Sequence, residues 1–236
     1  MMNLRFHWML PKGGEVSLNG PQTPRDAANY RLASTRAGSP APRPDIPGWT
    51  HFGKHAEDAG IDSLLVSFSR YEPDPILVSA ALGQTTSKLG FIAAYRSGLM
   101  KPTTFVQQLN TVSAFMPGRL SINIVAGSST AEQRGYGDYL AHDERYARAD
   151  EFLAVCHSFW RTNGDVNFDG KYYQVEHGKL HTPFFARERG GPEIYISGHS
   201  EQAEQLARSK GTCLLRVADT PEHLHAAFHR RLQGWV

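Results

Sequence analysis

The turn Gly198-His199-Ser200 carries residue types that suit an anion site, and it follows the apolar run EIYISG (193–198). Glycine at a strand end lets the backbone approach a ligand closely, because it has no Cβ. Ser200 is a typical N-cap for the helical pattern that follows, and the free N–H groups of a first helical turn attract anions. The turn is therefore a candidate phosphate site. The alternative is a tight turn followed by an ordinary N-cap.

A polar segment with several hydrogen-bonding side chains lies between the apolar run GRLSINIVAG (118–127) and a helical pattern at 144–160. His142 and Tyr146 are four residues apart near the start of that helix, so they share one face if the helix begins at His142. Both are candidate ligand contacts. The alternative for His142 is an exposed histidine beside a helix N-terminus.

Three charged side chains follow two other apolar runs. Arg70 and Glu72 come after SLLVSF (63–68), and Arg96 ends LGFIAAYR (89–96). A carboxylate such as Glu72 acts as a general base where burial raises its pKa, although it could equally pair with Arg70 at the surface. The two arginines could hold an anionic substrate group.

Six short apolar runs alternate with helical patterns along the chain, which predicts parallel strands joined by helical crossovers. The helix at 102–115 begins with a proline, which suits a first helical turn. The predicted strands are 4–10, 63–68, 89–96, 118–127, 193–198 and 212–218, and the predicted helices are 49–60, 73–86, 102–115, 144–160, 200–211 and one from about 221.

Two architectures fit this alternation, an open doubly wound sheet and a (β/α) barrel. No G-x-G-x-x-G fingerprint follows the first strand, and a complete barrel would need eight units where the chain supplies six. In both architectures the ligand site lies at the carboxyl ends of the strands. The residues just after each strand are therefore the first candidates for chemistry.

Two segments interrupt the alternation. Residues 11–48 are rich in Pro, Gly, Ser and Arg without periodicity, which is typical of a functional loop or a disordered segment. Residues 162–192 form an insertion in which Asp169-Gly170 predicts a β-hairpin.

Composition excludes several classes of protein. The formal net charge is +2 and no basic block stands out, so we expect no nucleic-acid partner. No apolar run approaches the roughly 20 residues of a membrane span, and the N-terminus lacks a signal-peptide pattern. We predict Cys156 and Cys213 to be buried free thiols in a cytoplasmic protein. The eleven histidines are scattered, and neither H-E-x-x-H nor C-x-x-C occurs, so no metal is expected.

Taken together, several segments resemble the bacterial luciferase-like flavin monooxygenases, and within them most closely the alkanesulfonate monooxygenases. The resemblance runs from about residue 4 to the C-terminus with few gaps apart from 11–48. The segments that carry it are FHWMLP, HAEDAGIDSLLV, AALGQTTSKLGFIAAYR, PTTFVQQLNTVSAFMPGRLSINIVAGSS, HDERYARADEF, FDGKYYQVEHGKL and IYISGHSEQAEQLA.

The resemblance implies a TIM-type barrel that binds reduced FMN, uses dioxygen, and oxidises a small organic substrate, for which a sulfonate-like compound is one candidate. It implies a separate flavin reductase as partner, and oligomers are common in the family, so we expect a homo-oligomer. Asn123 and Gly127 match the strand end near the flavin ring, and His142 and Tyr146 match residues that bind the ribityl-phosphate arm. Gly198, His199 and Ser200 match the phosphate-binding turn.

The chain departs from the family pattern at three points. Glu72 stands where alkanesulfonate monooxygenases carry a cysteine, and Arg216-Val217 stands where they carry Thr-Trp, so the resemblance does not identify the substrate. The sequence supplies six barrel units, so we expect one barrel domain over 1–236 that lacks its C-terminal units. Two alternatives to an oxygenase stay open: a non-catalytic flavin-binding protein or partner subunit, and a coenzyme F420 enzyme that transfers hydride without oxygen.

Overall fold

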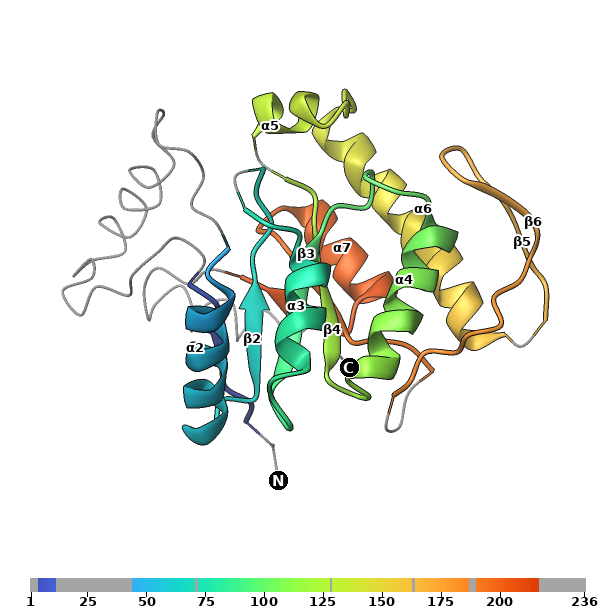
Figure 1. Ribbon diagram of the computed structural model, residues 1–236. Coiled ribbons are helices and arrows are strands. Elements are labelled where there is room, and N and C mark those ends of the chain that lie inside the picture. The colour runs from blue at the N-terminus through green and yellow to red at the C-terminus, as the bar shows by residue number, and fades with distance from the viewer. Residues whose placement is uncertain are drawn as a thin grey trace.

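The computed structural model describes residues 4–11, 44–70, 72–127, 129–162, 164–186 and 190–216. Six strands form one sheet in which every neighbouring pair is parallel, in the order β1-β2-β3-β4-β7-β8 (Figure 1). The strands are β1 (His7–Met9), β2 (Ser63–Val66), β3 (Gly90–Tyr95), β4 (Leu120–Val125), β7 (Ile194–Ser197) and β8 (Cys213–Leu215).

The strand order decides between the two predicted architectures. A doubly wound sheet reverses its strand order at a switch point, whereas a barrel adds each new strand beside the previous one. Here the six strands follow one another across the sheet in chain order. The described strands therefore form part of a TIM-type (β/α) barrel, as the resemblance implies.

Helices connect the strands. They are α2 (Ile46–Asp58), α3 (Pro75–Gly83), α4 (Pro102–Phe115), α5 (Thr130–Gly135), α6 (His142–Arg161) and α7 (Glu201–Lys210). Three of them, α2, α3 and α4, carry proline in the first turn, and Asp45 and Asp74 cap the first two through side-chain oxygens.

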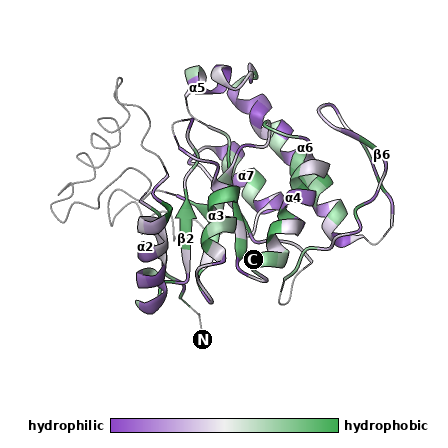
Figure 2. Cartoon of the chain, in the orientation of Figure 1, coloured by the Kyte–Doolittle hydropathy of each residue, from purple (hydrophilic) through white to green (hydrophobic). Residues whose placement is uncertain are grey.

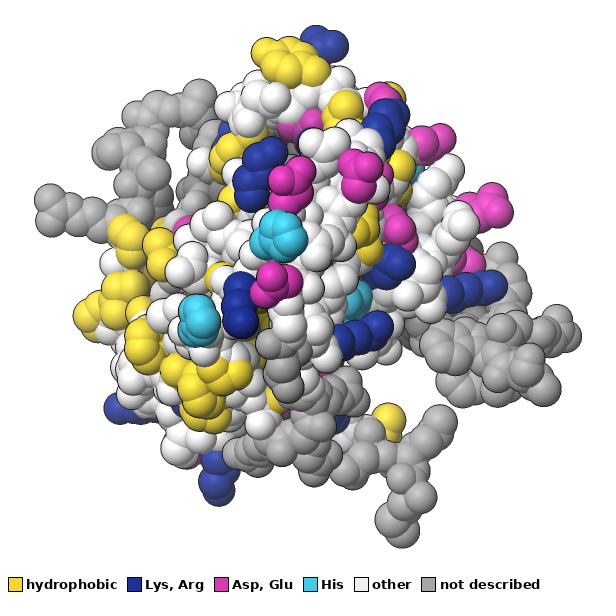
Figure 3. Space-filling model, turned by 90° about the vertical axis from the view of Figure 1, so that its right-hand side faces the viewer, with side chains coloured by type: hydrophobic (Ala, Val, Ile, Leu, Met, Phe, Trp, Pro, Cys, Tyr) yellow, Lys and Arg dark blue, Asp and Glu magenta, His cyan; other side chains and the backbone are white. Residues whose placement is uncertain are grey.

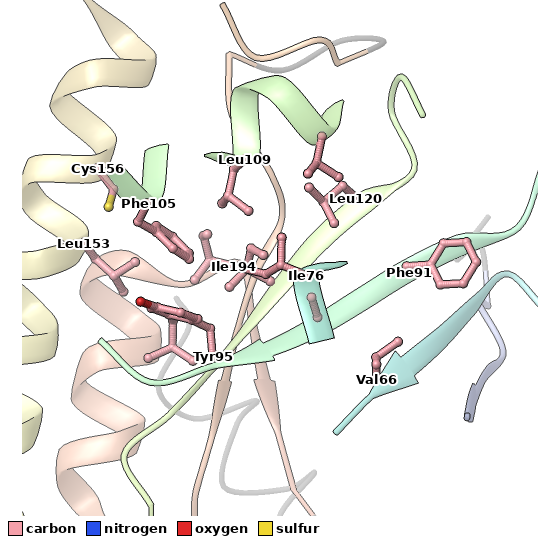
Figure 4. Packing of buried hydrophobic residues seen from close by; sticks show 14 of the residues in the cluster. Val66, Ile76, Phe91, Tyr95, Phe105, Leu109, Leu120, Leu153, Cys156 and Ile194 are labelled. Carbon is pink, nitrogen blue, oxygen red and sulfur yellow. The ribbon is translucent and has the colours of Figure 1, made fainter. Parts of the chain in front are cut away.

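Alternate strand residues build the hydrophobic core. Phe91, Ala93 and Tyr95 of β3 lie on the same side of the sheet as the cluster formed by the helices, and the intervening residues face the other way. Figure 4 shows Tyr95 and Phe105 side by side in this cluster; their ring centroids are 4.4 Å apart. The hydropathy colouring shows apolar residues along β2, while hydrophilic residues dominate the C-terminal turns of α2 and the N-terminal turns of α6 (Figure 2).

The predicted hairpin is confirmed as β5 (Val166–Asp169) and β6 (Gln174–Gly178), joined by residues 170–173. Tyr173 in that loop fixes the hairpin to the segment after β3, because its hydroxyl donates to the Ser97 carbonyl at 2.6 Å. Burial raises the Tyr173 pKa to about 12, so this hydroxyl keeps its proton near neutral pH.

Several sequence predictions need correction. Helix α2 begins at Ile46, inside the segment predicted as a loop, and α6 begins at His142 rather than at 144. Cys156 is fully buried as predicted, but Cys213 is half-buried. The helix predicted from about 221, and most of the 11–48 segment, lie outside the described residues.

The described surface mixes charges of both signs. Figure 3 shows Lys and Arg side chains interspersed with Asp and Glu on one face of the molecule. Among the helices that the described residues form, none combines the length and apolar character required to cross a bilayer.

Candidate functional site

The carboxyl ends of all six strands meet at one edge of the sheet, because the strands are parallel. In Figure 1 the β2 arrow points toward this edge, above which α5 lies. Asn123 of β4 and Ser197 of β7 face each other near it, and the Ser197 hydroxyl donates to Asn123 Oδ1 at 2.8 Å. Asn123 is buried, so this bond fixes the orientation of its amide inside the barrel.

The turn after β7 has the geometry of a close backbone approach. Gly198 has φ of +155°, and a Cβ at this position would lie 2.8 Å from the Tyr146 hydroxyl and 2.6 Å from Ala203 Cβ. Ser200 is the N-cap of α7, as predicted, and its hydroxyl accepts from the Ala203 N–H. The earlier N–H groups of the α7 first turn have no intrahelical acceptor, which leaves them for an anion.

His142 and Tyr146 share one face of α6, as their spacing predicts, with ring centroids 5.1 Å apart. Tyr146 is buried and its hydroxyl reaches the Gly198 backbone, while the half-exposed His142 bonds Asp143 through Nδ1 at 2.8 Å. Two segments some fifty residues apart in sequence therefore meet at one place.

Acidic residues at the α7 N-terminus would repel an anion, but their charge is partly balanced. Glu204 accepts from Arg216, which follows β8, and lies 3.7 Å from Arg208. Glu201 and His199 are exposed.

A second group forms around Arg96, which follows β3. Its guanidinium pairs with Glu132 at 2.7 Å and lies under the Phe68 ring, 4.8 Å from the centroid. Glu132 also accepts from the Arg70 N–H at 2.9 Å. Burial opposes ionisation of the Glu132 carboxyl, but the bonds from Arg96 and Arg70 outweigh it and hold the Glu132 pKa below its ordinary value.

Gly127 joins this group from the end of β4. Its φ is +77°, and a Cβ there would lie 1.6 Å from Gln133 Nε2 and 3.2 Å from Arg96 Nε. The buried Arg145 clamps the same loop, because its guanidinium donates to the carbonyls of Ala126, Gly127 and Leu140 at 2.8–3.0 Å. Only glycine fits between these side chains.

Glu72 lies at the same edge, beyond β2. Its carboxylate accepts from the Ser67 hydroxyl at 3.0 Å, and the side chain is half-buried. This contact ties Glu72 to the end of β2, where a catalytic carboxylate would need to lie, and its role stays a prediction.

Sequence reasoning missed Glu132 and Arg145. Ser129 and Glu132 have the spacing of a capping box, and the Ser129 hydroxyl accepts from the Glu132 N–H at 3.2 Å. The start of α5 could therefore have been predicted from this sequence pattern. The Glu132 side chain pairs with Arg96 instead of closing the box. Nothing in the local sequence marks Arg145 as a clamp.

Two other places in the molecule are weaker candidates for a functional site. A cavity of about 570 Å³ lies at the opposite, amino-terminal edge of the sheet, lined by Ser63 and Ser121 among others. His51 and His55 of α2 are four residues apart, a spacing that suits a metal ion. Within the described residues, however, no three potential metal ligands converge there or elsewhere.

Comparison with known proteins adds a family match. Residues 5–235 match the sequence model of a protein family described as luciferase-like monooxygenase.

Three solved structures share the fold. EDTA monooxygenase from Chelativorans sp. BNC1 is 24% identical with a TM-score of 0.71, and the alignment covers 90% of this chain and 53% of that one. A riboflavin lyase solved with modified FMN and riboflavin is 19% identical with a TM-score of 0.72, covering 98% and 57%. A long-chain alkane monooxygenase is 20% identical with a TM-score of 0.73, covering 97% and 60%. The chain therefore spans little more than half the length of these proteins.

Proposed function

Because the chain belongs to the luciferase-like monooxygenase family, we propose that it binds reduced FMN and uses dioxygen to oxidise a small organic substrate. One observation carries the proposal. The Tyr146 hydroxyl on α6 lies against the Gly198 backbone, directly before the N-terminus of α7. These are the residues for which the resemblance implies contact with the ribityl-phosphate arm.

The residues at this turn fit a phosphate. Gly198 lets Tyr146 and Ala203 pack directly against the turn. Ser200 caps only one N–H of α7, and the helix dipole favours an anion at its N-terminus. The ion pair between Arg216 and Glu204 reduces the net negative charge at the N-terminus of α7. Tyr146 would hold the arm from the α6 side, and His142 would lie at the solvent edge of the same face.

The residues along the inner face of the sheet fit a planar ring system. Ser67, Ala94 and Ser197 have small side chains there, and Asn123 presents a fixed amide. Gly127 follows the end of β4, where the resemblance implies that the flavin ring lies. Reduced FMN would supply two electrons to dioxygen at this place.

The chain's own side chains would then do three things. They would hold the flavin, exclude water from it, and donate or accept protons during the reaction. Glu72 is the candidate acid or base because it lies at the strand ends and is tied there by Ser67. Arg70 and Arg96 are the candidates for orienting the substrate.

The same proposal includes the finer predictions made from the sequence. We propose a separate flavin reductase as the source of reduced FMN, a homo-oligomeric assembly, a cytoplasmic location, and a substrate of sulfonate-like type. We also propose that residues 1–236 form one barrel domain.

A turnover experiment tests the proposed activity. The chain is mixed with reduced FMN, dioxygen and a panel of alkanesulfonates, sulfones and alkanes, while organic product and hydrogen peroxide are both measured. We expect one substrate class to give organic product at the expense of peroxide. If reduced FMN binds and every substrate leaves the peroxide yield unchanged, the chain is a flavin-binding protein without oxygenase activity.

A further inference from the structure

The Arg96 guanidinium is buried at the carboxyl edge of the sheet with only part of its hydrogen-bonding capacity used. Its side chain is 8% exposed, and Nη2 donates to Glu132 Oε2 at 2.7 Å. Nε and Nη1 are shielded from solvent and have no acceptor in the part of the chain that the structure describes. Since Nε carries one N–H and Nη1 carries two, three donors of a charged group are unmet there. Such groups are rare in folded proteins, and one at a ligand edge points to an acceptor that arrives with the ligand.

Two aromatic rings and one glycine enclose this guanidinium. The Phe68 centroid is 4.8 Å and the Tyr136 centroid 5.8 Å from Arg96 Cζ, and the two rings are 5.6 Å apart. Gly127 closes the third side. Phe68 is half-buried, whereas Tyr136 is 41% exposed at the C-terminal end of α5. The Tyr136 ring is therefore the wall that can move aside to admit a ligand.

The charges around this enclosure favour an anion. Two buried guanidiniums, Arg96 and Arg145, flank Gly127, and Glu132 is the one carboxylate hydrogen-bonded to either among the described residues. Farther out, Arg70 and Asp74 add one charge of each sign. A charged donor binds a charged acceptor about twice as strongly as a neutral one.

This place is separate from the proposed phosphate turn. Arg96 follows β3 and Gly198 follows β7, with β4 between them. Neighbouring strands lie about 4.8 Å apart, so the two residues are separated by roughly 10 Å across the sheet. A phosphate held at Gly198 would leave the Arg96 donors unmet.

We propose that Arg96 binds an anionic oxygen of the substrate, a carboxylate or sulfonate group, when the Tyr136 ring moves aside. The assignment of this anion to the substrate rests on the proposed function, whereas anion binding itself does not require flavin. Glu132 would keep its bond to Nη2 and hold the guanidinium in place while Nη1 donates to the ligand.

Binding of small probes to the flavin-free chain tests the proposal. Methanesulfonate and dimethyl sulfone have similar size and shape, but only the first carries a charge. We expect the chain to bind methanesulfonate at least tenfold more tightly than the sulfone in calorimetric titrations, because charge-assisted hydrogen bonds are the stronger. Equal affinities, or no binding of either probe, would overturn the proposal, and this comparison needs no variant.

Variants locate the binding. Arg96→Gln should weaken methanesulfonate binding about tenfold or more, whereas Arg134→Gln, which removes an exposed arginine of α5, should change it less than twofold. Tyr136→Ala should bind the probe at least as tightly as the wild type, because it opens the enclosure. Circular dichroism confirms that each variant is folded. A folded Arg96→Gln chain with unchanged affinity would refute the assignment.

Inorganic phosphate distinguishes the substrate's anion from the flavin's. If phosphate competes with methanesulfonate and depends on Arg96 more strongly than the sulfonate does, Arg96 serves the cofactor and the proposal is wrong. The proposed activity is tested separately by turnover with reduced FMN. Anion binding without turnover would support the Arg96 site and refute the oxygenase. Turnover without Arg96-dependent anion binding would support the oxygenase and refute the Arg96 site.

Discussion

Replacing Gly198 by alanine tests the packing on which the phosphate turn depends. The new Cβ would lie 2.6 Å from Ala203 Cβ and 2.8 Å from the Tyr146 hydroxyl, at a φ of +155° that favours glycine. The backbone strain should cost about 1–2 kcal/mol, and the overlap should add about 1–2 kcal/mol as Tyr146 or α7 shifts. We therefore expect Gly198→Ala to lower the free energy of unfolding by about 2–4 kcal/mol.

A second glycine separates strain from overlap. Gly60 has φ of +78°, and a Cβ added there would meet no described atom within 4 Å, so Gly60→Ala should cost only the backbone strain of about 1 kcal/mol. Urea denaturation followed by circular dichroism measures both variants. Tyr146→Phe removes one of the two clashing atoms, so the double variant with Gly198→Ala should recover about 0.5–1 kcal/mol relative to additivity. If Gly198→Ala costs no more than Gly60→Ala, the close approach of Tyr146 to Gly198 is wrong.

Three further perturbations test other parts of the site. The Glu132 pKa is held below its unfolded value, so its stabilising contribution is full above about pH 4.3 and lost as pH falls through the folded pKa. Glu132→Gln should therefore make the free energy of unfolding fall less steeply between about pH 5 and pH 3. The exposed Glu176→Gln should leave that fall as steep as in the wild type. Arg145→Met should cost about 3 kcal/mol in urea denaturation, because three carbonyls lose a buried donor; a loss no larger than that of exposed Arg134→Met would contradict the clamp. Burial raises the Cys156 pKa, so a thiol reagent should label Cys213 in the folded chain and Cys156 only on unfolding; fast labelling of Cys156 would mean that the core is open.

The sequence predicts an element well where its ends are chemically marked. Helix α4 occupies the predicted residues 102–115, because Pro102 suits the first turn and Pro117-Gly118 cannot continue a helix. Helix α5 is missed because it has only six residues, too few for an apolar period to show. The strands are shorter than their apolar runs, because residues at the ends of the runs do not pair in the sheet. Leu4 and Phe6 before β1, for example, are 80% and 63% exposed.

The candidate site likewise has parts that the local sequence predicts and parts that it does not. The contact of His142 with Tyr146 follows from helical spacing, and Ser200 from capping preference, so both are predictable from the local sequence. The pairing of Arg96 with Glu132 joins the end of β3 to the first turn of α5, thirty-six residues along the chain. No local pattern specifies that pairing, because the sheet order alone brings the two segments together.

Anaerobic titration of the purified chain with reduced FMN, beside reduced riboflavin, tests the central claim most directly. Riboflavin has the same ring and arm but lacks the phosphate. If the turn at Gly198 and Ser200 holds the phosphate, reduced FMN should bind saturably with one equivalent, and riboflavin should bind at least tenfold more weakly. Equal affinity for the two flavins would contradict the phosphate turn, and no saturable binding of reduced FMN would contradict the flavin site itself.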